Sequence, residues 1–466
     1  MLGRPARNAG FLFVGELATR ALGFAVTAVL TRRLGLDAFG QIAFGLSITA
    51  YGIMMTKAGL LTIGIRSIAR EPQEAGMLAG RVLTLRLLLA GLAFAGIVVF
   101  ALLLPRPAEV RWLLVLFAFG VFAQAIALEW VFTGEERMHH IAGAHILTNG
   151  VYFLLVFVFV GGPAQLLFVP AAFVVATLAG AAYLLANHSR RHGLPRLAWE
   201  PTVWRGLAVQ ALPVGLASIL TQLHVNAPIV ALALFRGDAE AGLYSAAHRF
   251  VFFVLLLDRI VQTVFLPIAA RHYRTRRKEL PATVGSILRA ALALAAPVCV
   301  LVVVFGPQVA ALLFGAGFIA SGEVMRVLIW FFPLSLVSTV GGYTLLAGDR
   351  ERRYALNTVV GVTAALVFVI FGSLRFGPLG AAAGMVAGEA VLAALMVAGM
   401  LGLVRPRLGR RALAVPAAIV PMVGIIIAFA NWHWLVVAAT AVAAYALVVF
   451  LARGVRLGDL GLGGSR

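Results

Sequence analysis

Eleven ionisable side chains lie inside long apolar stretches of this sequence, and they are its candidates for binding or proton chemistry. A charge in the lipid core costs at least ~2.5–3.5 kcal/mol, so each should face protein or water and mark an ion pair, a relay or a substrate path. The bases are Arg20, Lys57, Arg86, Arg249, Arg259, Arg289 and Arg326. The acids are Glu16, Glu129, Asp258 and Glu389.

Arg20 and Arg249 are the deepest of the bases, in the first and eighth predicted spans. Glu16 lies four residues before Arg20, on the same helical face, so the two either form an ion pair that locks one helix or line a central cavity. The rest of the sequence favours the cavity. A cleft with excess positive charge recognises anions, and the planar fork of arginine suits phosphate. Gln222 and His248 are predicted to join this substrate site.

The remaining bases have local explanations. Arg86 and Arg289 lie about one turn inside the cytoplasmic surface, where long side chains snorkel to water. Arg326 follows Glu323 by three residues and is expected to pair with it. Lys57 and Arg259 are either membrane anchors or charges at an inner gate.

Buried acids in membrane spans pair with cations or act in proton or sodium relays. We therefore keep Glu16, Asp258, Glu129 and Glu389, with Arg259 and Lys57, as candidates for ion coupling or ion pairing. A lone histidine such as His248 is more often a satisfied polar contact than a proton carrier.

The composition identifies the class of protein. Hydrophobic residues make up 62% of the 466 residues and charged residues 12%, against about 25% charged in soluble domains. The net charge of +20 does not indicate nucleic-acid binding, because the basic residues form short clusters between apolar runs. Cys299, the single cysteine, excludes an internal disulfide and a cysteine-based metal site. ATP-binding, metalloprotease and hydrolase motifs are missing, so we expect a non-enzymatic protein without cofactor or metal.

A membrane-scale window predicts about 14 transmembrane helices, an all-α polytopic fold. The predicted spans are 8–30, 38–63, 82–104, 111–133, 141–161, 165–187, 206–235, 242–268, 284–313, 323–347, 354–373, 378–403, 413–430 and 433–452. With the N-terminus inside, roughly 25 basic residues fall in inner loops and 6 in outer loops, so both termini are predicted to be cytoplasmic.

The spans contain a parallel repeat at an offset of about 200–215 residues. Asp37–Gln41 is echoed by Ala239–Leu243, and Arg86 by Arg289. The turn Gly134–Arg137 is echoed by Gly348–Glu351, and Gly162–Pro163 by Gly377–Pro378. Parallel repeats place the substrate path between two halves. The predicted domains are a six-helix bundle (1–187), a cytoplasmic linker (188–205), a second six-helix bundle (206–403), and two extra helices with a tail (404–466).

Several motifs resemble a known family. Thr31-Arg32-Arg33-Leu34-Gly35 and Gly64-Ile65-Arg66-Ser67-Ile68-Ala69-Arg70 resemble the opening of bacterial Wzx-type polysaccharide flippases. Ala241-Gly242-Leu243-Tyr244-Ser245-Ala246-Ala247-His248-Arg249 resembles their eighth span. Thr19-Arg20-Ala21-Leu22-Gly23-Phe24 resembles the first span of the lipid II flippase family. All belong to the multidrug/oligosaccharidyl-lipid/polysaccharide exporter superfamily.

The resemblance implies a V-shaped pair of bundles around a cationic cavity, in the bacterial inner membrane. It also implies flipping of undecaprenyl-pyrophosphate-linked oligosaccharide to the outer leaflet by alternating access, for O-antigen or exopolysaccharide synthesis. By position, Arg20 and Arg249 match cavity arginines that engage the lipid diphosphate. Membrane potential or antiport of a coupling ion, H⁺ or Na⁺, is the usual driving force; membrane lipids and a polysaccharide polymerase complex are further candidate partners.

Three alternatives remain open. A multidrug exporter of the same superfamily should have an acidic, aromatic cavity, whereas the deep charges here are basic. An integral-membrane glycosyltransferase or polymerase would normally have a large outer loop with catalytic residues, and the predicted outer loops are short. A non-transporting scaffold is the third alternative.

Overall fold

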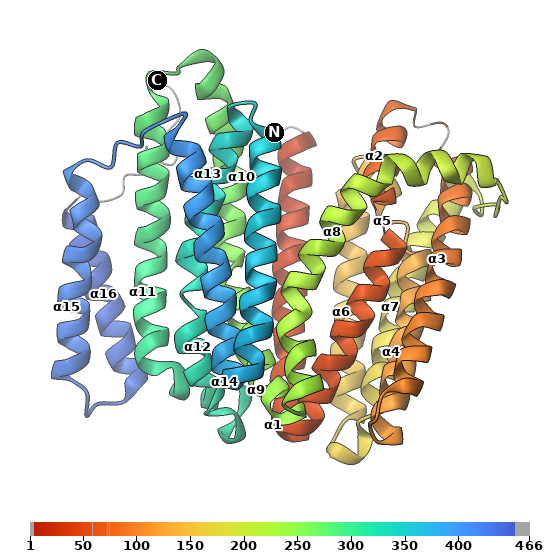
Figure 1. Ribbon diagram of the computed structural model, residues 1–466, viewed down its shortest axis with the longest axis horizontal. Helices are drawn as coiled ribbons and strands as arrows, with labels where there is room; N and C mark the ends of the chain where they lie inside the picture. Colours follow the sequence, from red (N-terminus) through yellow and green to blue (C-terminus); the bar gives the residue numbers. More distant parts are fainter. Residues whose placement is uncertain (1–3, 58, 72, 74, 453–466) are drawn as a thin grey trace. The chain divides into compact units, whose positions relative to one another are not determined.

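Long apolar runs with few breakers give the chain a helical structure, because a helix satisfies every backbone polar group within its own segment. The computed structural model describes residues 4–57, 59–71, 73 and 75–452, and within this part of the chain it contains helices and no strands (Figure 1). Some side chains inside these ranges are outside the description, namely those of residues 4–14, 16, 208, 213, 214, 216, 217, 221, 260, 263, 264 and 410.

The chain divides by its contacts into two units, Met1–Gly242 and Leu243–Arg466. The helices of the first unit are α1 (Arg4–Lys57), α2 (Leu60–Arg70), α3 (Ala75–Leu103), α4 (Ala108–Ile126), α5 (Glu129–Gly134), α6 (Met138–Phe159), the 3₁₀ helix η2 (Pro163–Gln165), α7 (Phe168–His192) and α8 (Pro201–Phe235). Helix α9 (Asp238–Val254) begins in the first unit and continues into the second.

The second unit continues with α10 (Leu256–Thr275), α11 (Leu280–Phe314), η3 (Ala316–Phe318), α12 (Ser321–Leu328), α13 (Phe331–Ala347), α14 (Glu351–Leu401), η4 (Arg410–Leu413), α15 (Ala414–Ala428) and α16 (Trp434–Leu451). Contacts place α8 with the first unit, whereas the sequence repeat groups it with the second bundle. Contacts group helices that pack together, whereas the repeat groups them by their order in the sequence. The predicted bundle boundaries therefore stay a prediction.

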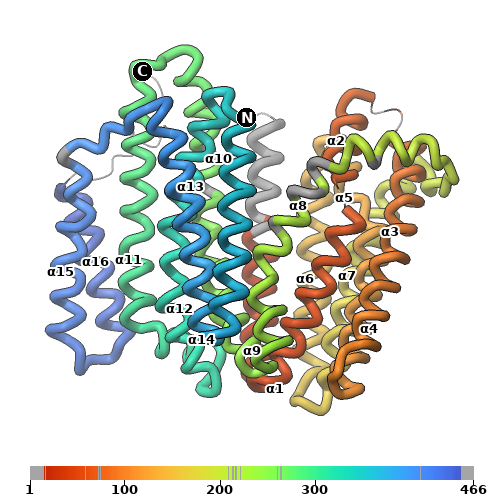
Figure 2. Tube along the Cα trace, in the orientation of Figure 1, coloured from red at the N-terminus to blue at the C-terminus, as the bar shows by residue number. Residues whose placement is uncertain are grey.

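Helix α14 is a hairpin of two spans. At 1.5 Å per residue its 51 residues would extend about 77 Å, far beyond the ~30 Å core of a bilayer. Gly377 interrupts it with a positive φ of 60°, which glycine adopts without strain. The two halves then pack antiparallel (Figure 2). A hydrogen bond joins them, because Asn357 donates to the carbonyl of Leu395 at 2.9 Å.

Helix α1 also contains two spans, which meet at Gly35 with φ 79°. Its first half runs parallel to α6, because Gly15 lies against Ala142 and Arg33 donates a hydrogen bond to the carbonyl of Val160. Its second half runs parallel to α4, because Gly45 lies against Leu113 and Gly52 lies against Val121. Because α4 and α6 belong to successive spans, which run in opposite directions, the two halves of α1 are antiparallel.

The predicted number of spans is confirmed. Within the described residues, twelve helical stretches are long and apolar enough to cross a membrane, and α1 and α14 are two of them. Because each of these two crosses twice, the twelve stretches correspond to the fourteen spans expected. The protein is a multi-pass, all-α membrane protein.

Small residues hold the α14 hairpin together. Gly380, Gly384 and Gly388 are spaced four apart, and the opposing half lies directly against each of them. Such stripes let helix backbones approach closely where lipid supplies no hydrophobic driving force. A Cβ at Gly384 would lie 2.6 Å from the carbonyl carbon of Phe368 and 2.7 Å from the amide nitrogen of Val369.

We expect Gly384→Ala to destabilise the protein by about 1–3 kcal/mol, because the added methyl group forces two backbones apart. The matched control is Gly424→Ala on α15, where a Cβ would meet nothing within 4 Å. Thermal unfolding in detergent should show a lower midpoint for Gly384→Ala than for the wild type and an unchanged midpoint for Gly424→Ala. Equal midpoints would contradict the close packing of the hairpin.

Four of the predicted spans are broken, two in each half, but the breaks lie at different depths along the corresponding spans. The fourth predicted span is broken between α4 and α5, and the tenth between α12 and α13. The second is interrupted at Gly59 (φ 76°) and the eighth at Leu255. The turns after the fourth and tenth spans each contain a left-handed acidic residue, Glu136 (φ 57°) and Asp349 (φ 55°). The sequence did not predict these breaks, and of these features the left-handed acidic turn is the one that supports the repeat.

One repeat motif forms a reciprocal contact inside the first unit. A Cβ at Gly40 would lie 2.6 Å from the carbonyl carbon of Asp238, and the amide of Gly242 is 3.0 Å from the same position. Conversely, Gly242 lies against the carbonyl of Leu36. Side chains reinforce the contact, because Asp238 accepts a hydrogen bond from Gln41 at 3.1 Å and pairs with Arg106 at 3.2 Å.

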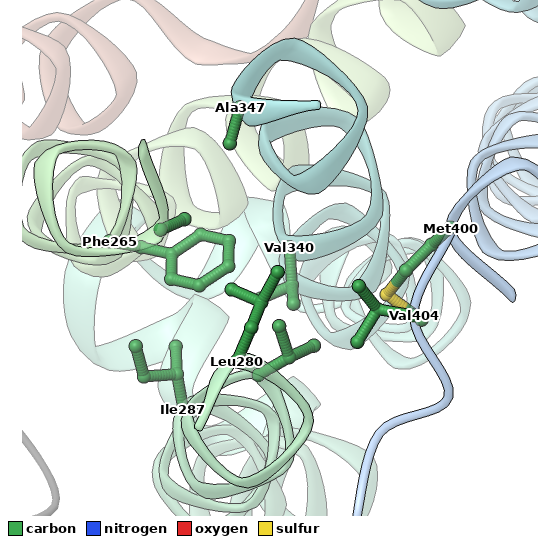
Figure 3. Packing of buried hydrophobic residues seen from close by; sticks show 9 residues of the cluster. Phe265, Leu280, Ile287, Val340, Ala347, Met400 and Val404 are labelled. Carbon is green, nitrogen blue, oxygen red and sulfur yellow. The ribbon is translucent and has the colours of Figure 1, made fainter. Parts of the chain in front are cut away.

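The core of the second unit lies where α10, α11, α13 and α14 meet. Phe265, Leu280 and Val340 are fully buried there, with Ile287 and Met400 beside them (Figure 3). The last two helices pack on α11, and the hydroxyl of Tyr445 donates to the carbonyl of Ala293 at 2.9 Å. This packing fixes α10 and α14, which carry the acidic residues described next, and α13, which carries the hydroxyl groups that bond them.

Candidate functional site

The predicted substrate residues lie on three helices. Arg20 is half-buried on the first half of α1, and Gln222 is half-buried on α8, both in the first unit. Arg249 is half-buried on α9 in the second unit. Beside it, His248 is buried and stacks on Phe252, with 3.9 Å between ring centroids.

The structure describes each unit by itself, so the pairing of Arg20 with Arg249 in one cavity stays a prediction. The side chain of Glu16 lies outside the described residues, so its pairing with Arg20 stays a prediction. Helix α1 does place Arg20 on the apolar stretch before the Gly35 break, as the sequence predicts.

Asp258 is the acceptor at the centre of a polar network in the second unit. The break at Leu255 places it in the first turn of α10, where the helix dipole favours a carboxylate. Its side chain is 5% exposed. Oδ2 accepts hydrogen bonds from Gln262 Nε2 (2.8 Å), Thr339 Oγ1 (3.2 Å) and Ser335 Oγ (3.3 Å).

The second carboxylate of this region is Glu389 on α14, which is 6% exposed. It accepts a hydrogen bond of 2.6 Å from Ser338 Oγ. Ser335, Ser338 and Thr339 fall at i, i+3 and i+4 on α13, so one face of that helix serves both acids. The Oδ1 atom of Asp258 is buried without a hydrogen-bond partner among the described residues.

The donors that bond these acids are neutral amides and hydroxyls. Arg259, the next residue along α10, is exposed and lies within electrostatic range of Asp258. Buried carboxylates with neutral donors are stable when they bind a proton or a metal cation, because an unpaired buried charge is costly. The geometry therefore suits reversible uptake of a small cation, with Asp258 and Glu389 as the acids.

Glu129 belongs to a different network in the first unit. It is the first residue of α5, directly after the break at Ala127–Leu128, and it bonds His145 Nε2 at 3.1 Å. Lys57, Arg86 and His145 all lie within electrostatic range of it. Glu129 is therefore stabilised by basic residues of its own unit. This arrangement agrees with ion pairing, one of the two roles expected for this residue. Lys57 is the last residue of α1 and is half-buried.

The prediction that Arg86 snorkels to water is wrong. Its side chain is 1% exposed and donates hydrogen bonds to the carbonyls of Ala127 (2.8 Å) and Gln124. These carbonyls lose their helical partners where α4 breaks, so the guanidinium replaces those partners. Arg289, its repeat counterpart, likewise binds backbone carbonyls, those of Leu408 (2.6 Å) and Arg407 (3.3 Å).

Replacing Arg86 by methionine should cost about 3–5 kcal/mol, because two buried carbonyls would lose their donors and Glu129 a nearby cation. Arg289→Met is the matched control, since its carbonyls are exposed and water can replace the side chain. The thermal unfolding midpoint should fall much further for Arg86→Met. A larger fall for Arg289→Met would show that the broken helix does not depend on Arg86.

Arg326 behaves as predicted, pairing with Glu323 at 2.7 Å. Reasoning from sequence missed the hydroxyls of α13 and the partner of Glu129. Ser335, Ser338 and Thr339 at helical spacing in an otherwise apolar span were a usable signal. His145 lies across a turn from Glu129, and no spacing rule connects two residues 16 apart on separate helices.

The matching family is described as polysaccharide biosynthesis protein, and its model matches residues 6–272, more than half of the chain. The chain belongs to the polysaccharide biosynthesis protein family. The match includes the positions of both Arg20 and Arg249. The resemblance noted in the sequence, to polysaccharide flippases within the multidrug/oligosaccharidyl-lipid/polysaccharide exporter superfamily, is confirmed.

A curated relative of this polysaccharide biosynthesis protein is the probable low-salt glycan biosynthesis flippase Agl15 of Haloferax volcanii. The two are 22% identical over 155 residues, which cover 33% of this chain and 33% of the relative. The similarity to that flippase therefore spans about a third of its length.

Two solved structures share the fold of this polysaccharide biosynthesis protein. The lipid II flippase MurJ, in an inward closed conformation, superimposes with a TM-score of 0.77 at 10% identity, over 94% of this chain and 98% of that one. A multidrug resistance MATE family transporter in an inward-facing conformation gives 0.62 at 16% identity, over 83% and 93%. At these identities the likeness establishes the fold alone.

Proposed function

We propose that this protein is a flippase that moves undecaprenyl-pyrophosphate-linked oligosaccharide from the cytoplasmic to the outer leaflet of the bacterial inner membrane. The observation that carries the proposal is the family match over residues 6–272, which includes both deep arginines. The flippase fold shared with MurJ and the partial similarity to Agl15 support it.

In this mechanism Arg20 and Arg249 hold the diphosphate, with Gln222 and His248 contributing polar contacts. Arginine is suited to this role because its guanidinium donates two parallel hydrogen bonds to phosphate oxygens and stays charged. The two halves alternate access to the two sides of the membrane, and no covalent chemistry is involved. Both termini are cytoplasmic in this proposal, following the asymmetry of basic residues between loops.

Coupling to H⁺ or Na⁺ is assigned to Asp258 and Glu389. Their hydrogen bonds to α13 support this assignment, because uptake of a cation would change the contacts between α10, α13 and α14. Glu129, Lys57 and Arg259 are not given a coupling role.

Deletion of the gene tests the function at the level of the cell. The expected result is loss of the surface glycan together with accumulation of its lipid-linked precursor in the inner leaflet. Normal surface glycan in the deletion strain, combined with sensitivity to cationic drugs, would favour the multidrug exporter. Loss of glycan polymerisation without loss of translocation would favour the polymerase.

A further inference from the structure

A cavity in the first unit, lined mainly by charged residues, has no part in the proposed transport mechanism. It has a volume of about 500 Å³ and is lined by Ala69, Gly134, Glu135, Glu136, Arg137, Arg191 and His192. The ends of α2, α5 and α7 and the beginning of α6 meet around it. A volume of this size is in the range of small-molecule sites and far exceeds that of a single ion.

Glu135 organises the charges of this cavity. Its Oε1 lies 2.6 Å from His192 Nε2, and its Oε2 lies 3.5 Å from Arg137 Nε, while its own side chain is only 10% exposed. Arg191, at the end of α7, makes no ion pair within the described residues. The lining therefore offers carboxylates from the α5–α6 turn and a guanidinium from a separate helix.

The cavity lies at the ends of candidate membrane spans. Two candidate membrane spans, Ala108–Gly134 and Phe168–His192, end at lining residues, and a third, Met138–Phe159, begins one residue after Arg137. A site at the ends of spans faces the layer in which the bilayer concentrates phosphate and amine groups. Among the described lining residues there is no Phe, Tyr or Trp to stack on a base or a sugar ring.

Charges of both signs exclude two simpler ligands. A purely anionic headgroup would lie against Glu135 and Glu136, and a purely cationic ligand against Arg137 and Arg191. A dipolar ligand with a phosphate and an ammonium satisfies both sets. We propose that this cavity binds the headgroup of phosphatidylethanolamine, with the phosphate held by Arg137 and Arg191 and the ammonium by Glu135 and Glu136. This proposal does not depend on the proposed cargo of the transporter.

Native mass spectrometry of the full-length protein in detergent tests the proposal, with equimolar phosphatidylethanolamine, phosphatidylcholine and phosphatidylglycerol added. The protein should retain phosphatidylethanolamine in preference to phosphatidylcholine, whose methylated amine cannot donate hydrogen bonds, and to the anionic lipid. Arg191→Gln should lower this retention about tenfold, the equivalent of one charge-assisted hydrogen bond. Arg190→Gln, one residue earlier and outside the lining, should leave it unchanged.

Glu136→Gln provides a second variant, because this exposed residue can change without removing Glu135. It should reduce the preference for phosphatidylethanolamine over phosphatidylglycerol. Equal retention of the three lipids, or equal loss in Arg190→Gln and Arg191→Gln, would overturn the proposal. Displacement of the lipid by free phosphoethanolamine at similar concentration would also overturn it, since the site would then recognise a soluble ligand.

Discussion

Replacing Arg20 and Arg249 together by alanine should reduce export of the glycan by about two to four orders of magnitude. Each guanidinium is proposed to donate charge-assisted hydrogen bonds to the diphosphate, worth ~1.5–3 kcal/mol for each arginine. Losing both amounts to about 3–6 kcal/mol, and every 1.4 kcal/mol is tenfold. The measurement is surface glycan in a deletion strain complemented with the variant, at matched protein level in the membrane.

Two further variants separate substrate binding from general effects of charge. Arg20→Lys plus Arg249→Lys keeps the charge but loses the planar fork, so export should be intermediate. Arg190→Ala plus Arg375→Ala removes one exposed arginine from each half and should leave export unchanged. Normal export in the Arg20→Ala plus Arg249→Ala variant would contradict the assignment of these residues to the diphosphate.

Asp258→Asn and Glu389→Gln are each expected to uncouple translocation from the ion gradient. Moving one charge through 60 mV is worth ~1.4 kcal/mol, so an imposed potential of this size should accelerate the wild type about tenfold. In either variant the rates with and without the gradient should be equal, because the amide cannot exchange a proton or attract Na⁺. The measurement is translocation in proteoliposomes with the potential, the pH gradient or the Na⁺ gradient imposed separately.

Glu279→Gln is the matched control for this experiment, since Glu279 is an exposed acid of the same unit that pairs only with Arg276 among the described residues. It should keep the full response to the gradient. A wild-type response retained in both Asp258→Asn and Glu389→Gln would show that the buried acids of α10 and α14 are structural.

The sequence was sufficient to predict the helical class and the number of spans, because the constraint that lipid places on backbone hydrogen bonds is strong and local. It also located the turns at Gly35 and Gly377 within a few residues, since each lies between two apolar runs. The breaks inside the fourth, eighth and tenth spans were not predictable in this way. There the sequence stays apolar, and distant residues such as Arg86 donate hydrogen bonds to the carbonyls that lose their helical partners.

For the candidate sites, too, the sequence indicates individual residues but not their tertiary contacts. Asp258 and Glu389 could be selected from sequence because a charge in an apolar run is conspicuous. Their connection through Ser335, Ser338 and Thr339 depends on how α13 packs between α10 and α14, which periodicity does not specify. For Arg86 the prediction from sequence was wrong. Its position near the end of a span suggested that it snorkels to water, whereas tertiary packing buries it.

The proposed cargo of this protein is a lipid-linked oligosaccharide. The most direct test of this proposal is translocation of labelled undecaprenyl-pyrophosphate oligosaccharide in proteoliposomes that contain the wild-type protein, with a cationic dye as the parallel cargo. The proposal predicts that the labelled lipid reaches the opposite leaflet well above the rate in protein-free vesicles, and that the dye does not cross. Transport of the dye without movement of the lipid would contradict it and identify a multidrug exporter.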